Sequence, residues 1–293
     1  MLSAIGLLTL ALLQPPAAAT PRLDTARTWA DLVHIVGLGP RPSGSPALDA
    51  TRTYLSDQLT AIGVTPVRQS WTAATPAGPI PMVNLRAVLP GEVPERIVLA
   101  GHYDTKRFTG VPFVGANDGG SSAALLLGLA RALQGQRHHY TIELLFLDGE
   151  ESTGEWEGTD HTYGSRYYVG QARADGTLAS LAAVVLVDMI GDRDLRISRE
   201  INSTRWLTDI VWRAADAAGY GETFVADTTA IEDDHLEFLE AGIPAVDLID
   251  LDYPEWHTPQ DTLAALSARS LQTVGTTVLA ALPLIEQHLR ATR

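Results

Sequence analysis

The sequence has no cysteine and a single lysine, Lys106, in 293 residues. The absence of cysteine excludes disulfide bonds, thiol nucleophiles, lipid attachment through a thiol and structural zinc sites made of thiolates. An exported chain without disulfides depends on its core, and about 270 residues can form a sizeable one. Lys106 is compatible with a compact ammonium near a functional site and equally with a solvated surface residue.

Positive charge is also scarce, because 21 Lys and Arg residues against 35 Asp and Glu give a formal net charge of −14. Such a chain is not expected to bind nucleic acid or anionic membranes. An acidic surface would suit cationic substrates, although solubility is a sufficient explanation. Hydrophobic residues make up 45% of the sequence, which is ordinary for a globular protein, so we expect a single domain over residues 20–293.

The first nineteen residues carry no charged side chain. Their apolar run, residues 4–13, is shorter than the roughly 20 residues that span a bilayer. Small residues at 17–19 complete the pattern of an export signal over residues 1–19, with a mature chain from about Thr20. An uncleaved anchor is the alternative, because no Lys or Arg precedes the run. We expect an exported protein, periplasmic or secreted, with no stable membrane insertion after signal removal.

Hydrophobic periodicity and breakers predict alternating helices and strands. Helices are predicted over residues 23–38, 47–62, 121–133, 163–171, 204–218, 234–241 and 267–289. Strands are predicted over residues 64–72, 82–89, 96–99, 142–147, 181–190 and 244–249. The first three strands are closely spaced, which suggests antiparallel neighbours. The later alternation predicts one α/β domain with a mixed sheet that is parallel in its centre.

The stretch from Leu144 to Glu151 joins a strand to a pair of carboxylates. Four apolar residues indicate a strand buried on both faces, and Asp148-Gly149 then ends it. Glu150 and Glu151 follow at the C-terminal end, which is where open α/β sheets bind ligands. Adjacent residues leaving a strand point in different directions, so one glutamate can bind a metal while the other carries a proton.

Other predicted strands end in similar residues. The set comprises His102, Asp118, Glu151, Asp188 and His257. Each alone has a structural explanation, such as a satisfied core histidine or a helix cap. Together they resemble a zinc site, and without cysteine a His/carboxylate set with an open position indicates catalysis. His138, His139 and His161 fall in predicted surface segments and are set aside.

Two further features have open interpretations. Trp156 and Trp256 each lie close in sequence to a candidate ligand, but core packing would also explain them. The acidic group from Ile231 to His235 opens a predicted helix, and an ordinary acidic helix start explains it equally well.

In these residues the sequence resembles the glutaminyl cyclases (glutaminyl-peptide cyclotransferases), relatives of the zinc-dependent aminopeptidases. The resemblance covers about residues 102–262 and is specific in separate blocks. These are residues 102–106 (HYDTK), 115–118 (GAND), 146–151 (FLDGEE), 163–166 (YGSR), 187–191 (VDMIG), 233–235 (DDH) and 256–258 (WHT). The resemblance implies a three-layer α/β/α sandwich around a mixed sheet.

The resemblance also implies roles for individual residues. One zinc ion would be bound by Asp118, Glu151 and His257, with Glu150 as general acid and base. Asp188 and Asp233 would form hydrogen bonds around Glu150 and tune its proton affinity. Substrate contacts would come from Trp156, Trp256, Glu232 and Tyr253. In the di-zinc aminopeptidases, the positions of His102 and Asp188 bind a second metal.

Three departures from the animal cyclases leave the expected chemistry in place. Glu232 stands where glutamine is expected, and Tyr253 stands in place of a phenylalanine in a loop one residue shorter. The vertebrate cysteine pair is absent. The resemblance also predicts a cis peptide bond after Asp118, which Gly119 would make easier to accommodate.

The first functional hypothesis is a zinc acyltransferase that cyclises N-terminal glutamine of peptides or proteins to pyroglutamate and releases ammonia. It would bind one zinc ion and act as a monomer. The alternative is an aminopeptidase with two zinc ions, and a third hypothesis is a non-catalytic binding domain on the same scaffold. The complete ligand set and Glu150 argue against the third.

Overall fold

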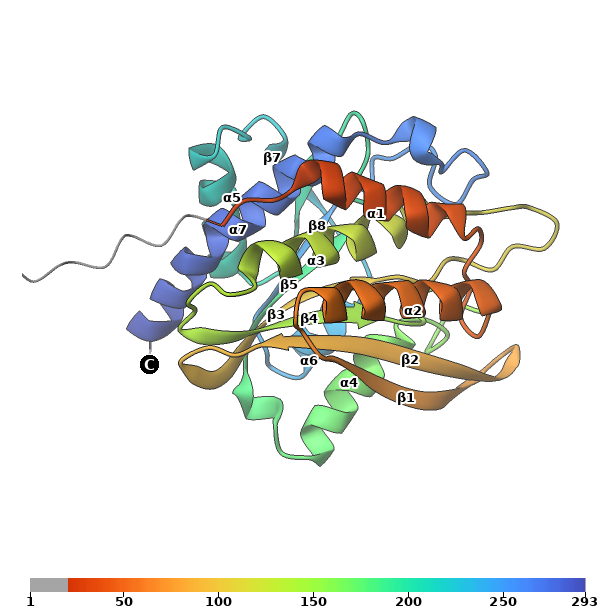
Figure 1. The fold of residues 1–293 in the computed structure, drawn as a ribbon, viewed down its shortest axis with the longest axis horizontal. Helices are drawn as coiled ribbons and strands as arrows, with labels where there is room; N and C mark the ends of the chain where they lie inside the picture. Colours follow the sequence, from red (N-terminus) through yellow and green to blue (C-terminus); the bar gives the residue numbers. More distant parts are fainter. Residues whose placement is uncertain (1–20, 293) are drawn as a thin grey trace, which may run out of the picture.

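The computed structural model describes residues 21–292 (Figure 1). Its helices are α1 (Thr25–Gly37), α2 (Pro46–Ala61), α3 (Gly120–Leu133), α4 (Tyr163–Ala174), α5 (Arg205–Ala217), α6 (His235–Glu240) and α7 (Ala268–Ala291). Its strands are β1 (Pro66–Thr75), β2 (Gly78–Leu89), β3 (Val93–His102), β4 (Tyr140–Leu147), β5 (Leu181–Asp188), β6 (Ile197–Glu200), β7 (Phe224–Thr229) and β8 (Ala245–Ile249). The predicted export signal and the start at Thr20 lie outside the described residues.

The main sheet has six strands in the order β1-β2-β4-β3-β5-β8. The pairs β1–β2 and β2–β4 are antiparallel, whereas β4, β3, β5 and β8 run parallel to one another. The predicted mixed sheet with a parallel centre is therefore confirmed. The expectation of three antiparallel neighbours holds for β1 and β2 and is wrong for β3. Residues 97–102 of β3 are buried throughout, as expected for a central strand. The short spacing between strands in the sequence does not reveal that β3 lies in the centre of the sheet.

Alternate residues of the central strands face two separate cores. In β4, Ile142, Leu144 and Phe146 belong to the core under α1, α2, α3, α5 and α7. Leu145 and Leu147 face the smaller core under α4 and α6. Figure 1 shows α1, α2, α3 and α7 covering one face of the sheet, with α4 on the other. This is the expected three-layer sandwich.

The two strands that the sequence did not predict, β6 and β7, form a small parallel sheet beside β8. β6 is only four residues long and carries Arg199 and Glu200, so no apolar alternation marks it. Within residues 21–292, none of the helices is both long enough and apolar enough to cross a membrane.

Candidate active site

The carboxyl ends of the central strands converge on a cavity of about 370 Å³. Its lining comprises Asp118, Glu150, Glu151, Trp156, Asp188, Met189, Ala230, Ile231, Glu232, Asp233, Ile249, Leu251, Trp256 and His257. Most of the predicted site residues are in this set. The cavity therefore lies where an open α/β sheet is expected to bind its ligand.

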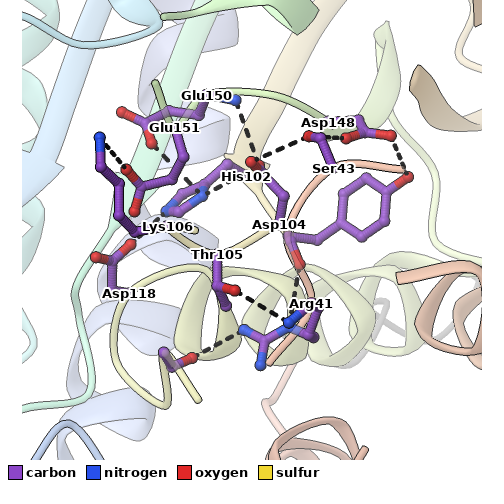
Figure 2. A network of polar contacts seen from close by, with 12 residues as sticks. Arg41, Ser43, His102, Asp104, Thr105, Lys106, Asp118, Asp148, Glu150 and Glu151 are labelled. Carbon is purple, nitrogen blue, oxygen red and sulfur yellow. Dashed lines mark hydrogen bonds and ion pairs between the residues drawn. The ribbon is translucent and has the colours of Figure 1, made fainter. Parts of the chain in front are cut away.

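The turn after β4 is fixed by Asp148, which is fully buried. Its carboxylate accepts hydrogen bonds from Ser43 Oγ at 2.7 Å and from the backbone amide of Val83 at 2.7 Å. Gly149 follows with φ +75°, and a Cβ there would lie 2.6 Å from Met82 Sδ. The turn thereby delivers both Glu150 and Glu151 to the cavity. Figure 2 shows their side chains beside His102.

Asp118, Glu151 and His257 bring one ligand atom each within 4.8 Å of the others. His257 Nε2 lies 3.1 Å from Glu151 Oε1 and 3.3 Å from Asp118 Oδ2. Ligand atoms of a tetrahedral zinc ion, bound at 2.0–2.1 Å, are separated by about 3.3 Å. The second oxygen of Glu151 and Asp118 Oδ2 are buried without a hydrogen-bond donor. Spacing, burial and donor type therefore fit a bound zinc ion.

His102, Asp118 and Asp188 form a second group with metal-ligand spacing. His102 Nε2 lies 3.0 Å from Asp188 Oδ1 and 3.2 Å from Asp118 Oδ1. Asp118 belongs to both groups, one carboxylate oxygen facing each. The arrangement can hold one or two cations.

Burial raises the pKa of Glu150 well above that of an ordinary glutamate, and the charges of Glu151, Asp233 and Asp234 raise it further. His102, whose Nδ1 lies 3.7 Å from Glu150 Oε2, acts in the opposite direction. The expected effect of Asp233 on the proton affinity of Glu150 is therefore present, and Glu151 and Asp234 contribute to it as well. Asp188 instead pairs with His102. A raised pKa suits a group that accepts and then donates a proton.

Behind Asp233 lies a buried acidic group that the sequence did not reveal. Asp247 is fully buried in β8, and both its carboxylate oxygens lack a hydrogen-bond partner. His235 lies between Asp247 (3.7 Å) and Glu200 (3.0 Å). Burial and the charge of Asp188 raise the pKa of Asp233 to about 6. Asp247 lies inside an apolar strand, so the sequence shows it only as a single acidic residue within a hydrophobic run.

The two predicted tryptophans line the cavity from different loops. Trp256 is 44% exposed and stacks on its neighbour His257, with ring centroids 4.3 Å apart. Trp156 stacks on His161 at 4.3 Å and donates its indole N–H to Glu232 at 3.0 Å. The expectation that His161 lies at the surface is wrong, because it is 5% exposed and covered by Trp156.

Tyr253 lies outside the cavity lining, although we expected it to contact substrate. It is 3% exposed, and its hydroxyl donates to Asp261 Oδ1 at 2.8 Å. The Asp261 carboxylate in turn accepts hydrogen bonds from the backbone amides of Asn117 and Asp118. The ring is turned inward by this bond, so Tyr253 supports the loop that carries Asp118.

The peptide bond after Asp118 is trans, so the predicted cis bond is wrong. The turn into α3 is made instead by Gly119 at φ +78°, where a Cβ would lie 2.2 Å from the carbonyl oxygen of Asp104. A positive φ at glycine reverses the chain without the cost of a non-proline cis bond.

Two basic residues support the site. Lys106 donates to Ser152 Oγ, and its Nζ lies 3.8 Å from Glu151 Oε2 (Figure 2). Its place beside a candidate ligand agrees with the functional interpretation. Arg41, which precedes α2, is fully buried and donates hydrogen bonds to the carbonyl oxygens of Val114 and Gly115. It fixes the segment that leads to Asp118.

Backbone strain is concentrated at the site. Among residues 21–292, the non-glycine residues with positive φ are Thr162 (48°), Met189 (44°) and His257 (55°). Met189 and His257 line the cavity, and Thr162 follows His161. Such conformations are costly and tend to be kept at functional sites.

Comparison with known proteins places these features in a family. The chain matches the model of Peptidase family M28 over residues 84–282. It is 31% identical to a mouse glutaminyl-peptide cyclotransferase-like protein, covering 84% of this chain and 72% of that protein. A solved glutaminyl cyclase from an Acidobacteriales bacterium has a TM-score of 0.89 and 37% identity, covering 95% of this chain and 100% of that one. A solved leucine aminopeptidase precursor from Bacteroides thetaiotaomicron has a TM-score of 0.83 and 28% identity, covering 90% of this chain and 98% of that one.

Proposed function

Because the chain belongs to Peptidase family M28 and is a homologue of the glutaminyl-peptide cyclotransferases, we propose that it cyclises N-terminal glutamine. The product is a pyroglutamyl peptide, and ammonia is released. The observation that carries this proposal is the Glu150–Glu151 pair, in which one carboxylate joins a metal-ligand group and its neighbour has a raised pKa. The substrates are peptides or proteins that begin with glutamine.

Asp118, Glu151 and His257 would hold a zinc ion. When bound there, the ion would polarise the amide carbonyl of the glutamine side chain and stabilise the negative charge that develops on its oxygen.

Glu150 is proposed to move the proton. The α-amine nitrogen forms a bond to the side-chain amide carbon, and the bond from that carbon to the departing nitrogen then breaks. Glu150 takes a proton from the attacking nitrogen and delivers it to the leaving nitrogen as ammonia forms. Because an α-amine has a pKa of roughly 8, freeing it at pH 7 costs only about 1.4 kcal/mol. Delivering the proton is the harder task, and the raised pKa of Glu150 suits it.

Trp156 and Trp256 are proposed to enclose the glutamine side chain. Cyclisation joins two ends of one residue, so the site has to enforce a bent conformer and exclude water. Both rings line the same cavity as Glu150. Asp188 fixes His102, and Asp233 adds negative charge beside Glu150.

A second candidate is an aminopeptidase with two zinc ions, which the His102–Asp118–Asp188 group favours. The two candidates differ in products and in metal content. The purified protein should release ammonia from glutaminyl peptides and leave leucyl peptides intact, with one zinc per chain. Release of free leucine without ammonia from glutamine, together with two zinc ions per chain, would reverse the choice.

We infer further that the protein is exported and acts as a monomer. The segment at residues 1–19 supports export. Mass analysis of the protein from the host cell and sedimentation of the purified protein test these two statements.

A further inference from the structure

The ring of Trp156 is held at two places that belong to different parts of the chain. Its indole N–H donates to Glu232 Oε2 at 3.0 Å, in the loop between β7 and α6. One face stacks on His161, with ring centroids 4.3 Å apart and an interplanar angle of 7°. Trp156 also lines the cavity.

The His161 ring on which Trp156 stacks is itself held in place by its neighbours. It is 5% exposed, and its Nδ1 lies 3.2 Å from Thr162 Oγ1. Its carbonyl oxygen accepts a hydrogen bond from Arg166 at 2.9 Å. Its Nε2 lies 3.7 Å from Glu232 Oε1, so the same carboxylate faces both rings.

The loop that carries Trp156 gives it little other support. Residues 152–162 contain no helix or strand, and residues 154, 155 and 157–159 are exposed. Asp160 closes the base of the loop by accepting the backbone amides of Thr153 and Gly154. Within the described part of the chain, Glu232 accepts the hydrogen bond of the Trp156 indole and His161 stacks on its ring.

We propose that Glu232 is a positioning residue, which with His161 clamps Trp156 in the orientation that lines the cavity. This role rests on the proposed cyclisation, because the clamped ring is the wall that bends the substrate. Glu232 acts through Trp156 and needs no contact with the reacting atoms. The clamp joins the loop after β4 to the loop before α6, so both have to be in place for the wall to form.

The clamp can be observed directly through the indole N–H. The six tryptophans give six indole signals when labelled with ¹⁵N, and a Trp156→Phe variant identifies that of Trp156. Glu232→Leu removes the acceptor and should shift this signal and speed its exchange with water. Glu232→Gln keeps an acceptor oxygen and should largely preserve it. The signals of the other tryptophans serve as the internal reference.

Activity is measured on the same variants with a glutaminyl peptide. Glu232→Leu should lower kcat/KM about 10-fold, because the hydrogen bond that orients Trp156 is lost. Trp156→Phe keeps an aromatic ring but loses the indole N–H, so its kcat/KM should fall by a similar factor. The double variant should lose about 10-fold rather than about 100-fold, because both changes remove one interaction. Glu157→Leu, an exposed glutamate in the same loop, is the matched control and should stay near wild type.

Several results would overturn the proposal. An unchanged Trp156 signal in Glu232→Leu would show that no clamp exists. Additive losses in the double variant, or an equal loss in Glu232→Gln, would assign the effect to charge acting on the substrate. If the wild-type protein releases no ammonia, the proposed function fails, while the indole signal still reports whether Glu232 holds Trp156.

Discussion

The floor and the walls of the cavity are built in different ways. On the floor, His102, Asp118, Glu150 and Asp188 stand at or just beyond strand ends or at the start of α3, and none is more than 7% exposed. The walls are Trp156 and Trp256, which stand on loops, and Trp256 is 44% exposed. Rigid strand ends are suited to holding reacting groups, whereas loops can change with the substrate. Damage to the floor should therefore lower kcat, and damage to the walls should also raise KM.

Removing the metal should have the largest effect. Dialysis against a chelator should abolish ammonia release, and added zinc should restore it, because Asp118, Glu151 and His257 would then lack the charge they surround. The melting temperature should also rise on adding zinc, since a ligand that binds only the folded chain stabilises it. Full activity in chelated protein whose zinc content is shown to be zero would contradict this account of the floor.

Glu150→Gln should follow, with a loss in kcat of about 10³-fold, because the group that transfers the proton is removed. KM should change little, since the walls are intact. Zinc content should remain that of wild type, which separates the loss of the proton carrier from the loss of a ligand. Glu157→Gln, an exposed change of the same type on the following loop, is the control. A Glu150→Gln variant that keeps its rate would remove Glu150 from the mechanism.

The sequence predicted most of this floor and less of its surroundings. A buried apolar run followed by Asp148-Gly149 marks a strand end, so the sequence alone places Glu150 and Glu151 at that end. Asp247 could not, because an acid inside β8 becomes meaningful only when Asp233 is seen beside it. Such contacts join residues far apart in the chain, and no local pattern encodes them.

The walls show the same limit. Both tryptophans are identified from the sequence, but the ring partner of Trp156 is not, because His161 is expected at the surface. Tyr253 is expected to contact substrate and instead donates a hydrogen bond to Asp261. Loop side chains turn towards whichever partner completes their hydrogen bonds, and Asp261 decides this for Tyr253. The order of β3 in the sheet was likewise missed, because strand spacing does not determine which strands pair.

Truncating the Trp256 wall should affect substrate binding as well as turnover. Trp256→Ala should lower kcat/KM about 10²-fold, because misplacing the substrate by about 1 Å has an effect of that size. Much of the loss should be in KM, in contrast to Glu150→Gln. Trp256→Phe is the matched variant and should recover most of the loss, because it retains a ring. If the Ala variant changed only kcat, with zinc content intact, the division between floor and walls would be wrong on this side.

Lys106→Met should have the smallest effect on activity. Its main effect should be a lower affinity for zinc. Lys106 Nζ lies 3.8 Å from Glu151 Oε2, so its charge helps to orient a carboxylate whose other oxygen faces His257. Losing such an outer partner should weaken zinc binding about 10-fold, measured by competition with a chelator, while kcat at saturating zinc stays within a few-fold. Lys106 is the only lysine, so acetylation of the wild type should reproduce the change, and a Lys106→Arg variant should resist the reagent. Unchanged zinc affinity in both the Met variant and the acetylated protein would place Lys106 outside the floor.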